Sequence, residues 1–225
     1  MQHSWKLFNF ATQLREDEAH ILLANVPHFM VRLPDYQQFL NREESLRYQL
    51  PQAIIARGLL RELLACYLNC VPKDIQFHYN AQGKPNVASI QFNISHAKEK
   101  IIFIFHQTKQ VGIDIEYTQR PIDYLKIAHR FFFITEYHFL QKQLPEKIAH
   151  MFFTIWTLKE AYVKAHGKGV SAFRTFSIIE KDKLTLTPAW SYANIPLTNF
   201  YQGTYVIAGR SPPNTNFYFI EPHIM

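Results

Sequence analysis

Three observations predict an α+β fold for this chain of 225 residues. Apolar residues recur at helical spacing in two long stretches, from Pro51 to about Asn69 and from about Pro145 to His166. Short apolar or alternating segments between and after them are typical of strands. In each half of the chain the helices come first and antiparallel-looking strands follow, so helices and strands are segregated rather than alternating.

The elements are expected in the following order. A strand-like segment at 20–26 leads into a loop with two prolines, and a short helix covers 36–48. Pro51 suits the first position of a longer helix, because that position needs no backbone N–H. We expect further helices at 122–132, 135–144 and 145–166, and strands at 75–79, 90–95, 101–106, 111–117, 176–180, 183–187, 203–208 and 217–221.

The helix that begins at Pro51 has one clear buried face. Its apolar stripe leaves Arg57 and Arg61 together on the other side. The stripe fixes the direction of Arg57, whereas Arg61 and Arg42 are expected in solvent. The stripe consists of Ile55, Leu59, Leu60, Leu63, Leu64 and Tyr67.

The helix at 145–166, which the glycines Gly167 and Gly169 end, carries two different strips. An exposed Glu–Lys pair at i,i+4 is worth only about 0.2–0.5 kcal/mol. Large rings beside such a pair indicate partial burial, where charged groups usually have a function. The core strip is Ile148, Met151, Phe152, Ile155, Tyr162 and Ala165, and the second strip is Phe153, Trp156, Glu160 and Lys164.

Composition limits the class of protein. A hydrophobic content of 48%, with 15% aromatic residues, excludes a disordered chain. The cysteines Cys66 and Cys70 lack companion ligands for a structural zinc site, and so few thiols suit a reducing cytosol. The apolar block Ile101–Phe105 is too short to cross a bilayer, and the N-terminus shows no signal peptide. We therefore expect a cytoplasmic protein without a membrane partner.

The net charge of +6 comes from 24 basic and 18 acidic residues. Such a surplus suits nucleic acid, an anionic membrane, or an acidic protein or phosphate-rich ligand. No long Lys/Arg tract or nucleic-acid-binding signature is present, so nucleic acid is not expected. A phosphate-rich ligand together with an acidic docking partner accounts for the charge, although plain soluble domains also carry such an excess.

The segment Val111–Glu116 places two carboxylates on one face of a strand. Asp114 and Glu116 point to the same side, about 7 Å apart along the strand, and can share one hard cation. Gly112, on the same side, is expected to leave the approach to Asp114 open. Taken alone, the pattern favours a half-solvated strand with its carboxylates in water.

A third element precedes both of these. Gly83–Lys84–Pro85 is a tight turn that carries a cation, and it leads to Ser95 and His96 on a strand. Neighbouring residues on a strand point to opposite faces. Ser95 and His96 are therefore poorly placed as a nucleophile and its base, and better placed as two hydrogen-bond donors.

In this order and spacing, the elements resemble the 4′-phosphopantetheinyl transferases, specifically their long, surfactin-type branch. The family's motifs match at Gly83–Pro85 with Phe92–His96, at Val111–Glu116, and at Trp156–Lys164 continuing to Gly169, and the segment Arg130–Tyr137 resembles its paired aromatics followed by an acid. The resemblance spans about Glu43 to Ser171. It implies a pseudo-twofold pair of similar α+β subdomains, residues 1–108 and 109–225, with the active site in the cleft between them. The polar segment Gln107–Gln110 fits such a boundary and fits a hairpin turn equally well.

The resemblance also implies a reaction. The serine hydroxyl of an apo acyl or peptidyl carrier protein attacks the β-phosphate of coenzyme A, takes the phosphopantetheine arm and releases 3′,5′-ADP. Mg²⁺, or Mn²⁺ in its place, would be held by Asp114, Glu116 and Glu160, with Lys164 on the pyrophosphate. Glu136 is the first candidate for the base and Glu160 the second, although an ordinary solvated Glu136 is equally compatible.

Lys84, Ser95 and His96, together with Lys164, are implied to bind coenzyme A. Arg57 and Arg47 are further candidates for its phosphates, although Arg47 is equally compatible with plain surface. The branch implies a monomer serving polyketide or nonribosomal-peptide biosynthesis. Two other functions fit parts of the pattern: another Mg²⁺-dependent phosphoryl or nucleotidyl transferase, and a noncatalytic module that binds coenzyme A or a carrier protein.

Overall fold

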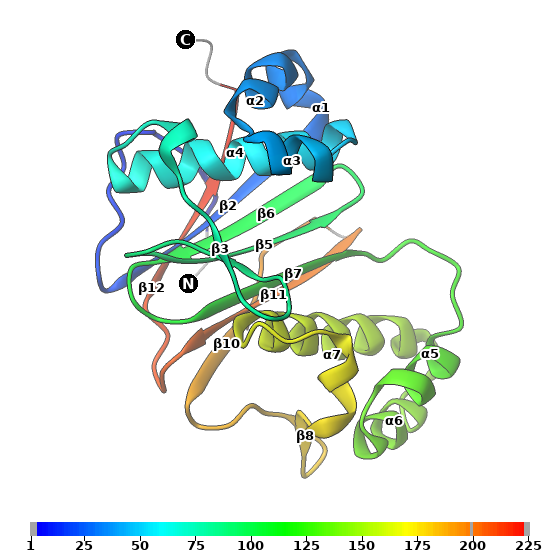
Figure 1. Ribbon diagram of the computed structural model, residues 1–225. Coiled ribbons are helices and arrows are strands. Elements are labelled where there is room, and N and C mark those ends of the chain that lie inside the picture. The colour runs from blue at the N-terminus through cyan, green and yellow to red at the C-terminus, as the bar shows by residue number, and fades with distance from the viewer. Residues whose placement is uncertain (1–3, 199, 223–225) are drawn as a thin grey trace.

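The computed structural model describes residues 4–198 and 200–222. Helix, sheet, sheet and helix follow one another as layers from top to bottom in Figure 1. The α+β class predicted from the sequence is confirmed. One apolar core lies between each helix layer and its sheet, and a third lies between the two sheets.

The first sheet has the order β1-β12-β2-β6-β5. Strand β6 pairs antiparallel with β2 on one side and with the edge strand β5 on the other, and β12 pairs with β2 in parallel. The bounds are β1 Lys6–Leu7, β2 Glu18–Asn25, β5 Gln91–Ala97, β6 Lys100–His106 and β12 Asn214–Phe219.

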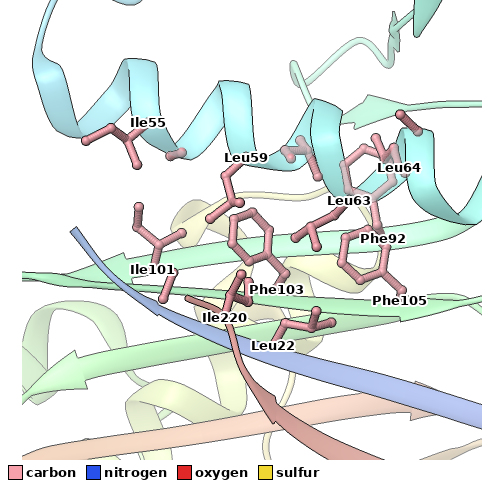
Figure 2. Close-up of a cluster of buried hydrophobic side chains, with 14 of the residues drawn as sticks. Leu22, Ile55, Leu59, Leu63, Leu64, Phe92, Ile101, Phe103, Phe105 and Ile220 are labelled. Atoms are coloured by element: carbon pink, nitrogen blue, oxygen red, sulfur yellow. The ribbon is translucent and has the colours of Figure 1, made fainter. Parts of the chain in front are cut away.

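Helix α4, Pro51–Leu68, covers one face of this sheet. Its predicted stripe is confirmed: Figure 2 shows Ile55, Leu59, Leu63 and Leu64 on the side of α4 that faces strand side chains, among them Ile101, Phe103 and Phe92. Shorter helices pack beside it, namely α1 Val26–Phe29, α2 Leu33–Phe39 and α3 Arg42–Arg47.

The second sheet has the antiparallel order β10-β11-β7 and is covered by α7 on its outer face. Alternation along β7 sends Val111, Ile113 and Ile115 into the core between the sheets. The bounds are β7 Val111–Tyr117, β10 Trp190–Asn194, β11 Tyr201–Ala208, α5 Tyr124–Phe131, α6 Ile134–Gln141 and α7 Pro145–Ala165.

Several predicted boundaries were wrong. The helix expected at 36–48 is two helices, because Asn41 caps α3 with its side chain on the Glu44 N–H and the Glu44 carboxylate returns to the Asn41 N–H. Strand β10 was missed. The short remaining pieces are β3 His78–Tyr79, β4 Pro85–Asn86, β8 Ile179–Glu180, β9 Lys183–Leu184 and the 3₁₀ segments Met30–Arg32, Pro72–Asp74 and Val170–Thr175.

Residues 107–110 connect β6 of the first sheet to β7 of the second. The last strand, β12, returns from the C-terminal half to the first sheet and pairs with β2. The first sheet therefore contains strands from both halves of the chain. Within the described residues, no helix is both long and apolar enough to span a bilayer.

Candidate active site

The two strand carboxylates lie where the sheets meet. Asp114 and Glu116 share the face of β7 that is directed toward α7, as the alternation predicts, and Asp114 is only 3% exposed. Strands β5 and β7 lie next to each other here without backbone pairing. Instead, β5 side chains accept from the β7 backbone: the Ile113 N–H donates to Asn93 Oδ1 at 2.9 Å.

Asp114 is the centre of a short polar network. Lys164 Nζ, from α7, donates to Asp114 Oδ1 at 2.6 Å and to Ser95 Oγ at 2.9 Å. Ser95 Oγ donates to the same Asp114 Oδ1 at 2.8 Å. Three elements that are distant in the sequence, β5, β7 and α7, thus meet at one carboxylate oxygen.

Glu116 and Glu160 belong to the same electrostatic cluster. Burial, opposed by Lys164 but assisted by Asp114 and Glu116, raises the pKa of Glu160 to about 7. Burial and Asp114 likewise raise the pKa of Glu116, against the effect of Arg120, Lys164 and the Trp156 indole. Carboxylates that repel one another in a half-buried site gain from a bound cation.

One atom of this arrangement, Asp114 Oδ2, is suited to a divalent cation. Asp114 Oδ2 is buried and accepts no hydrogen bond, although a buried carboxylate oxygen normally has a partner. Across the described residues, no three His, Cys, Asp or Glu side chains lie close enough together to hold a metal by themselves. Mg²⁺ needs only one or two carboxylates when phosphate oxygens and water supply the other ligands.

Gly112 serves a different purpose from the one expected. A Cβ at this position would lie 1.9 Å from the Ala161 carbonyl oxygen of α7. The glycine therefore permits close approach of the helix to the strand, and the helix backbone occupies the space that was expected to admit a ligand. The predicted second strip of α7 is likewise only partly right, since Phe153 is buried in the core.

A pocket of about 220 Å³ lies between α4 and the turn that contains Gly83. It brings together Arg47, Arg57 and His96, three of the residues predicted to bind coenzyme A, and Tyr79 joins them. Ser95 points away from it into the Asp114 network, as opposite faces of a strand require.

Arg57 and Arg61 are both buried, which corrects the expectation that Arg61 lies in solvent. Arg57 Nε donates to Glu44 Oε1 at 2.5 Å, and Arg61 Nη2 donates to Glu44 Oε2 at 2.7 Å. Although burial opposes its ionisation, the hydrogen bonds from Arg61, the Asn41 N–H and Arg57 keep the pKa of Glu44 below its usual value. The sequence analysis indicated neither of the two arginine partners of Glu44.

Lys84 lies at the end of α7. Its Nζ donates to the Ala165 carbonyl oxygen at 2.9 Å, and burial lowers the pKa of Lys84 to about 8. Asn80 Nδ2 donates to the Gly167 carbonyl oxygen at 3.3 Å. The turn therefore holds the C-terminus of α7, where a cation also complements the helix dipole.

Glu136 does not join the carboxylate cluster. It is fully buried, and its Oε1 accepts from Lys159 Nζ at 2.7 Å and from the Ile178 N–H at 2.8 Å, while Oε2 accepts from the Phe133 N–H. Both oxygens are occupied and neither meets solvent. The structure thus gives Glu136 no access to a substrate hydroxyl, and Lys159, which the sequence analysis did not single out, becomes its structural partner.

Comparison of the sequence with known proteins points to one family. The sequence model of the 4′-phosphopantetheinyl transferase superfamily matches residues 110–208. The 4′-phosphopantetheinyl transferase HetI of Nostoc sp. is 32% identical over 208 residues, which cover 85% of this chain and 88% of the relative. Sfp of Bacillus subtilis is 33% identical over 60% of this chain and 58% of its own length, and gsp of Aneurinibacillus migulanus is 37% identical over 60% and 54%.

This chain, with its layered fold and its cluster of carboxylates, is thus an enzyme of the transferase class. This chain belongs to the 4′-phosphopantetheinyl transferase superfamily, and its surfactin-type relationship is supported by the similarity to Sfp.

Proposed function

We propose that this chain transfers the 4′-phosphopantetheine arm of coenzyme A to a serine hydroxyl of an apo carrier protein. The serine oxygen bonds to the β-phosphorus, the bond to the bridging oxygen breaks, and 3′,5′-ADP leaves with that oxygen. The observation that carries the proposal is Asp114, whose buried Oδ2 has no partner while Lys164 lies on its Oδ1. Membership of the superfamily supports it independently.

Mg²⁺, when bound, would neutralise the charge of the pyrophosphate and stabilise the negative charge on the leaving group. Asp114 and Glu116 would hold it, and Glu160 of the facing helix stays available for another role, because no three carboxylates of the described residues lie close enough to hold a metal together. Mn²⁺ has the same preference for oxygen ligands and serves as its substitute in experiments.

The remaining roles follow from position and protonation. Lys164, one turn beyond Glu160, brings a positive charge to the pyrophosphate. Glu160, with a pKa of about 7, suits acceptance of the hydroxyl proton near neutral pH, and it replaces Glu136 as the proposed base. His96, Arg47 and Arg57 line the pocket proposed for the nucleotide end of coenzyme A, whereas the Lys84 ammonium donates to the end of α7.

The wider expectations from the sequence stay predictions. They are a cytoplasmic monomer, a carrier protein of polyketide or nonribosomal-peptide biosynthesis as partner, and a division into residues 1–108 and 109–225. Support for the division comes from the connection at 107–110 and from the position of Asp114 between β5 and α7, whereas β12 crosses it.

The test is incubation with Mg²⁺, coenzyme A and a panel of apo carrier proteins, followed by intact-protein mass measurement. We expect the mass increment of the phosphopantetheine arm on at least one carrier, and none when the metal is chelated. Coenzyme A binding without any transfer would favour the noncatalytic module. Transfer of a different phosphoryl or nucleotidyl group would favour the other enzyme class.

A further inference from the structure

We infer that Asn80 is a positioning residue for the proposed coenzyme A site, because its side chain folds the turn at 80–85 and holds this turn on the end of α7. The inference rests on the proposed function, since Gly83 and Pro85 of the turn line the pocket proposed for the nucleotide end of coenzyme A. Lys84, which lies between them, is the residue that the sequence predicted to contact the coenzyme. The sequence analysis did not single out Asn80.

The turn depends on Asn80 for its shape. Asn80 Oδ1 accepts from the N–H of Gln82 at 3.1 Å and from the N–H of Lys84 at 2.8 Å. The Asn80 backbone takes part as well, since its N–H donates to the Lys84 carbonyl oxygen at 3.1 Å and its carbonyl oxygen accepts from the Gly83 N–H at 2.9 Å. The flanking strands β3 and β4 have two residues each, and a hairpin so short is not stable by itself. The Asn80 side chain therefore fixes the backbone from which the Lys84 side chain extends.

The other end of the same amide reaches the helix. Asn80 Nδ2 donates to the Gly167 carbonyl oxygen at 3.3 Å, and the Gly167 N–H donates in turn to the Lys164 carbonyl oxygen at 3.1 Å. Gly167 has a φ of 65°, and a Cβ at this position would collide with Asn80 Nδ2. Glycine is thus needed here both for the backbone conformation and for the contact with Asn80. The bond ties the turn to the segment that directly follows Lys164, the cation proposed for the pyrophosphate.

The contacts that Asn80 and Lys84 make with the helix end differ in kind. Lys84 Nζ donates to the Ala165 carbonyl oxygen at 2.9 Å from a flexible four-carbon stem, so it can turn from this oxygen to a phosphate. Asn80 has a short, uncharged side chain that is bonded on both sides. The Asn80 amide therefore keeps the turn in place while the Lys84 ammonium moves between helix and coenzyme.

The test is coenzyme A affinity, measured by calorimetry with the metal chelated, for wild type and Asn80→Ala. We expect Asn80→Ala to bind coenzyme A on the order of 10-fold more weakly. In the transfer reaction KM for coenzyme A should rise while kcat stays at the wild-type value, because Asp114 holds Lys164 independently. A role in stability alone would lower the amount of folded enzyme and leave KM unchanged.

A second variant tests whether Asn80 acts through the helix end. Gly167→Ala should weaken coenzyme A binding in the wild-type background and have a much smaller effect in the Asn80→Ala background, where the added Cβ no longer meets the amide. The matched control is Asn9→Ala in the loop between β1 and β2. Asn9 is also exposed, and its Oδ1 likewise accepts from the N–H two residues on, that of Ala11 at 2.9 Å. This variant should bind coenzyme A as the wild type does.

Unchanged coenzyme A affinity in Asn80→Ala would overturn the inference, and so would equal effects of Gly167→Ala in the two backgrounds. If Asn80→Ala does not fold, Asn80→Ser takes its place, because a serine hydroxyl still accepts from the N–H two residues on but is too short to reach Gly167. Unchanged affinity in Asn80→Ser would then overturn the inference. Failure of the proposed function looks different: wild type itself would bind no coenzyme A, or would bind it and modify no carrier protein.

Discussion

At the scale of single residues, the cost of burying charge explains much of this protein. Asp114, Glu44 and Glu136 are all nearly inaccessible to water. Both oxygens of Glu44 and of Glu136 are satisfied by protein donors, so these two stabilise structure. Of these three, Asp114 alone keeps an oxygen without a partner, and this observation supports the proposal that Asp114 binds a cation.

The first prediction is that Asp114→Asn lowers transfer by on the order of 100-fold or more. The amide keeps the shape but loses the negative charge that holds a cation, a loss of several kcal/mol in the transition state. Transfer rates at saturating Mg²⁺ and intact-mass measurement provide the readout. The control is Asp182→Asn, which changes an exposed carboxylate whose Oδ1 lies 3.7 Å from Lys142 Nζ. This variant should transfer the arm at the wild-type rate. Full activity of Asp114→Asn would remove the metal assignment.

The second prediction concerns His106, a fully buried imidazole at the end of β6. Its Nδ1 accepts from the N–H groups of Thr108 and Lys109, so the ring is neutral there. Burial, and secondarily Lys109, lowers the pKa of His106 to about 4 from its ordinary value of 6.5.

Because the folded pKa lies below the unfolded value, the unfolded chain binds the proton first as the pH falls. The free energy of unfolding should therefore decrease between about pH 6.5 and pH 4, by up to about 3 kcal/mol from this residue. Urea unfolding across this range measures the effect. His106→Asn keeps the acceptor at the Nδ1 position without titrating, and its stability should fall less steeply. Equal slopes for the two proteins would contradict the assignment.

At the scale of elements, the contact between β7 and α7 sets the geometry of the site. Asp114 and Glu116 come from the strand, and Glu160 and Lys164 come from the helix, so the distance between the two elements decides whether they meet. Gly112 permits a short distance, because a Cβ at this position would collide with the Ala161 carbonyl oxygen. At the far end of α7, Lys84 and Asn80 hold the last turn.

The third prediction is that Gly112→Ala destabilises the protein by about 3 kcal/mol and lowers transfer further than the loss of folded protein explains. The added Cβ would meet backbone, which cannot rotate away, so strand and helix must separate. Thermal unfolding and activity per folded molecule measure the two effects. Gly169→Ala is the control, because its Cβ meets nothing within 4 Å and its φ of −106° suits alanine. A Gly112→Ala variant with wild-type stability would show that the two elements can shift apart without cost.

At the scale of the whole molecule, the net charge of +6 should act on encounter with the carrier protein. Proteins of the carrier class commonly present an acidic helix beside the modified serine, which implies long-range attraction to this cationic enzyme. Screening acts on exposed charges over about 10 Å at ordinary ionic strength. Salt screens Asp114 less, because its side chain is buried.

The fourth prediction is that raising salt lowers kcat/KM for the carrier protein more than it lowers kcat at saturating carrier. Transfer to one carrier protein is measured over a range of ionic strength, with coenzyme A binding followed in parallel. A flat profile for the carrier would mean that the positive charge serves the coenzyme or nothing specific. A profile that rises with salt would indicate docking through apolar contacts.

Much of this protein could be predicted from the sequence, because the informative patterns are local. The stripe of α4, the alternation along β7 and the proline that begins each long helix depend on neighbours a few residues apart. The same patterns placed Asp114, Glu116, Glu160 and Lys164 on two elements. The spacing of the motifs then indicated the family to which the chain belongs.

Only the tertiary structure decided what each polar side chain touches. Ser95 lies on Asp114, Lys84 on the end of α7, and Glu136 on Lys159 rather than in the site. Partners that lie between 19 and 81 residues apart leave no periodic signal in the sequence, because their meeting depends on how whole elements pack. The sequence thus determined the elements and the chemical groups available, and packing determined which of those groups remain free to meet a ligand.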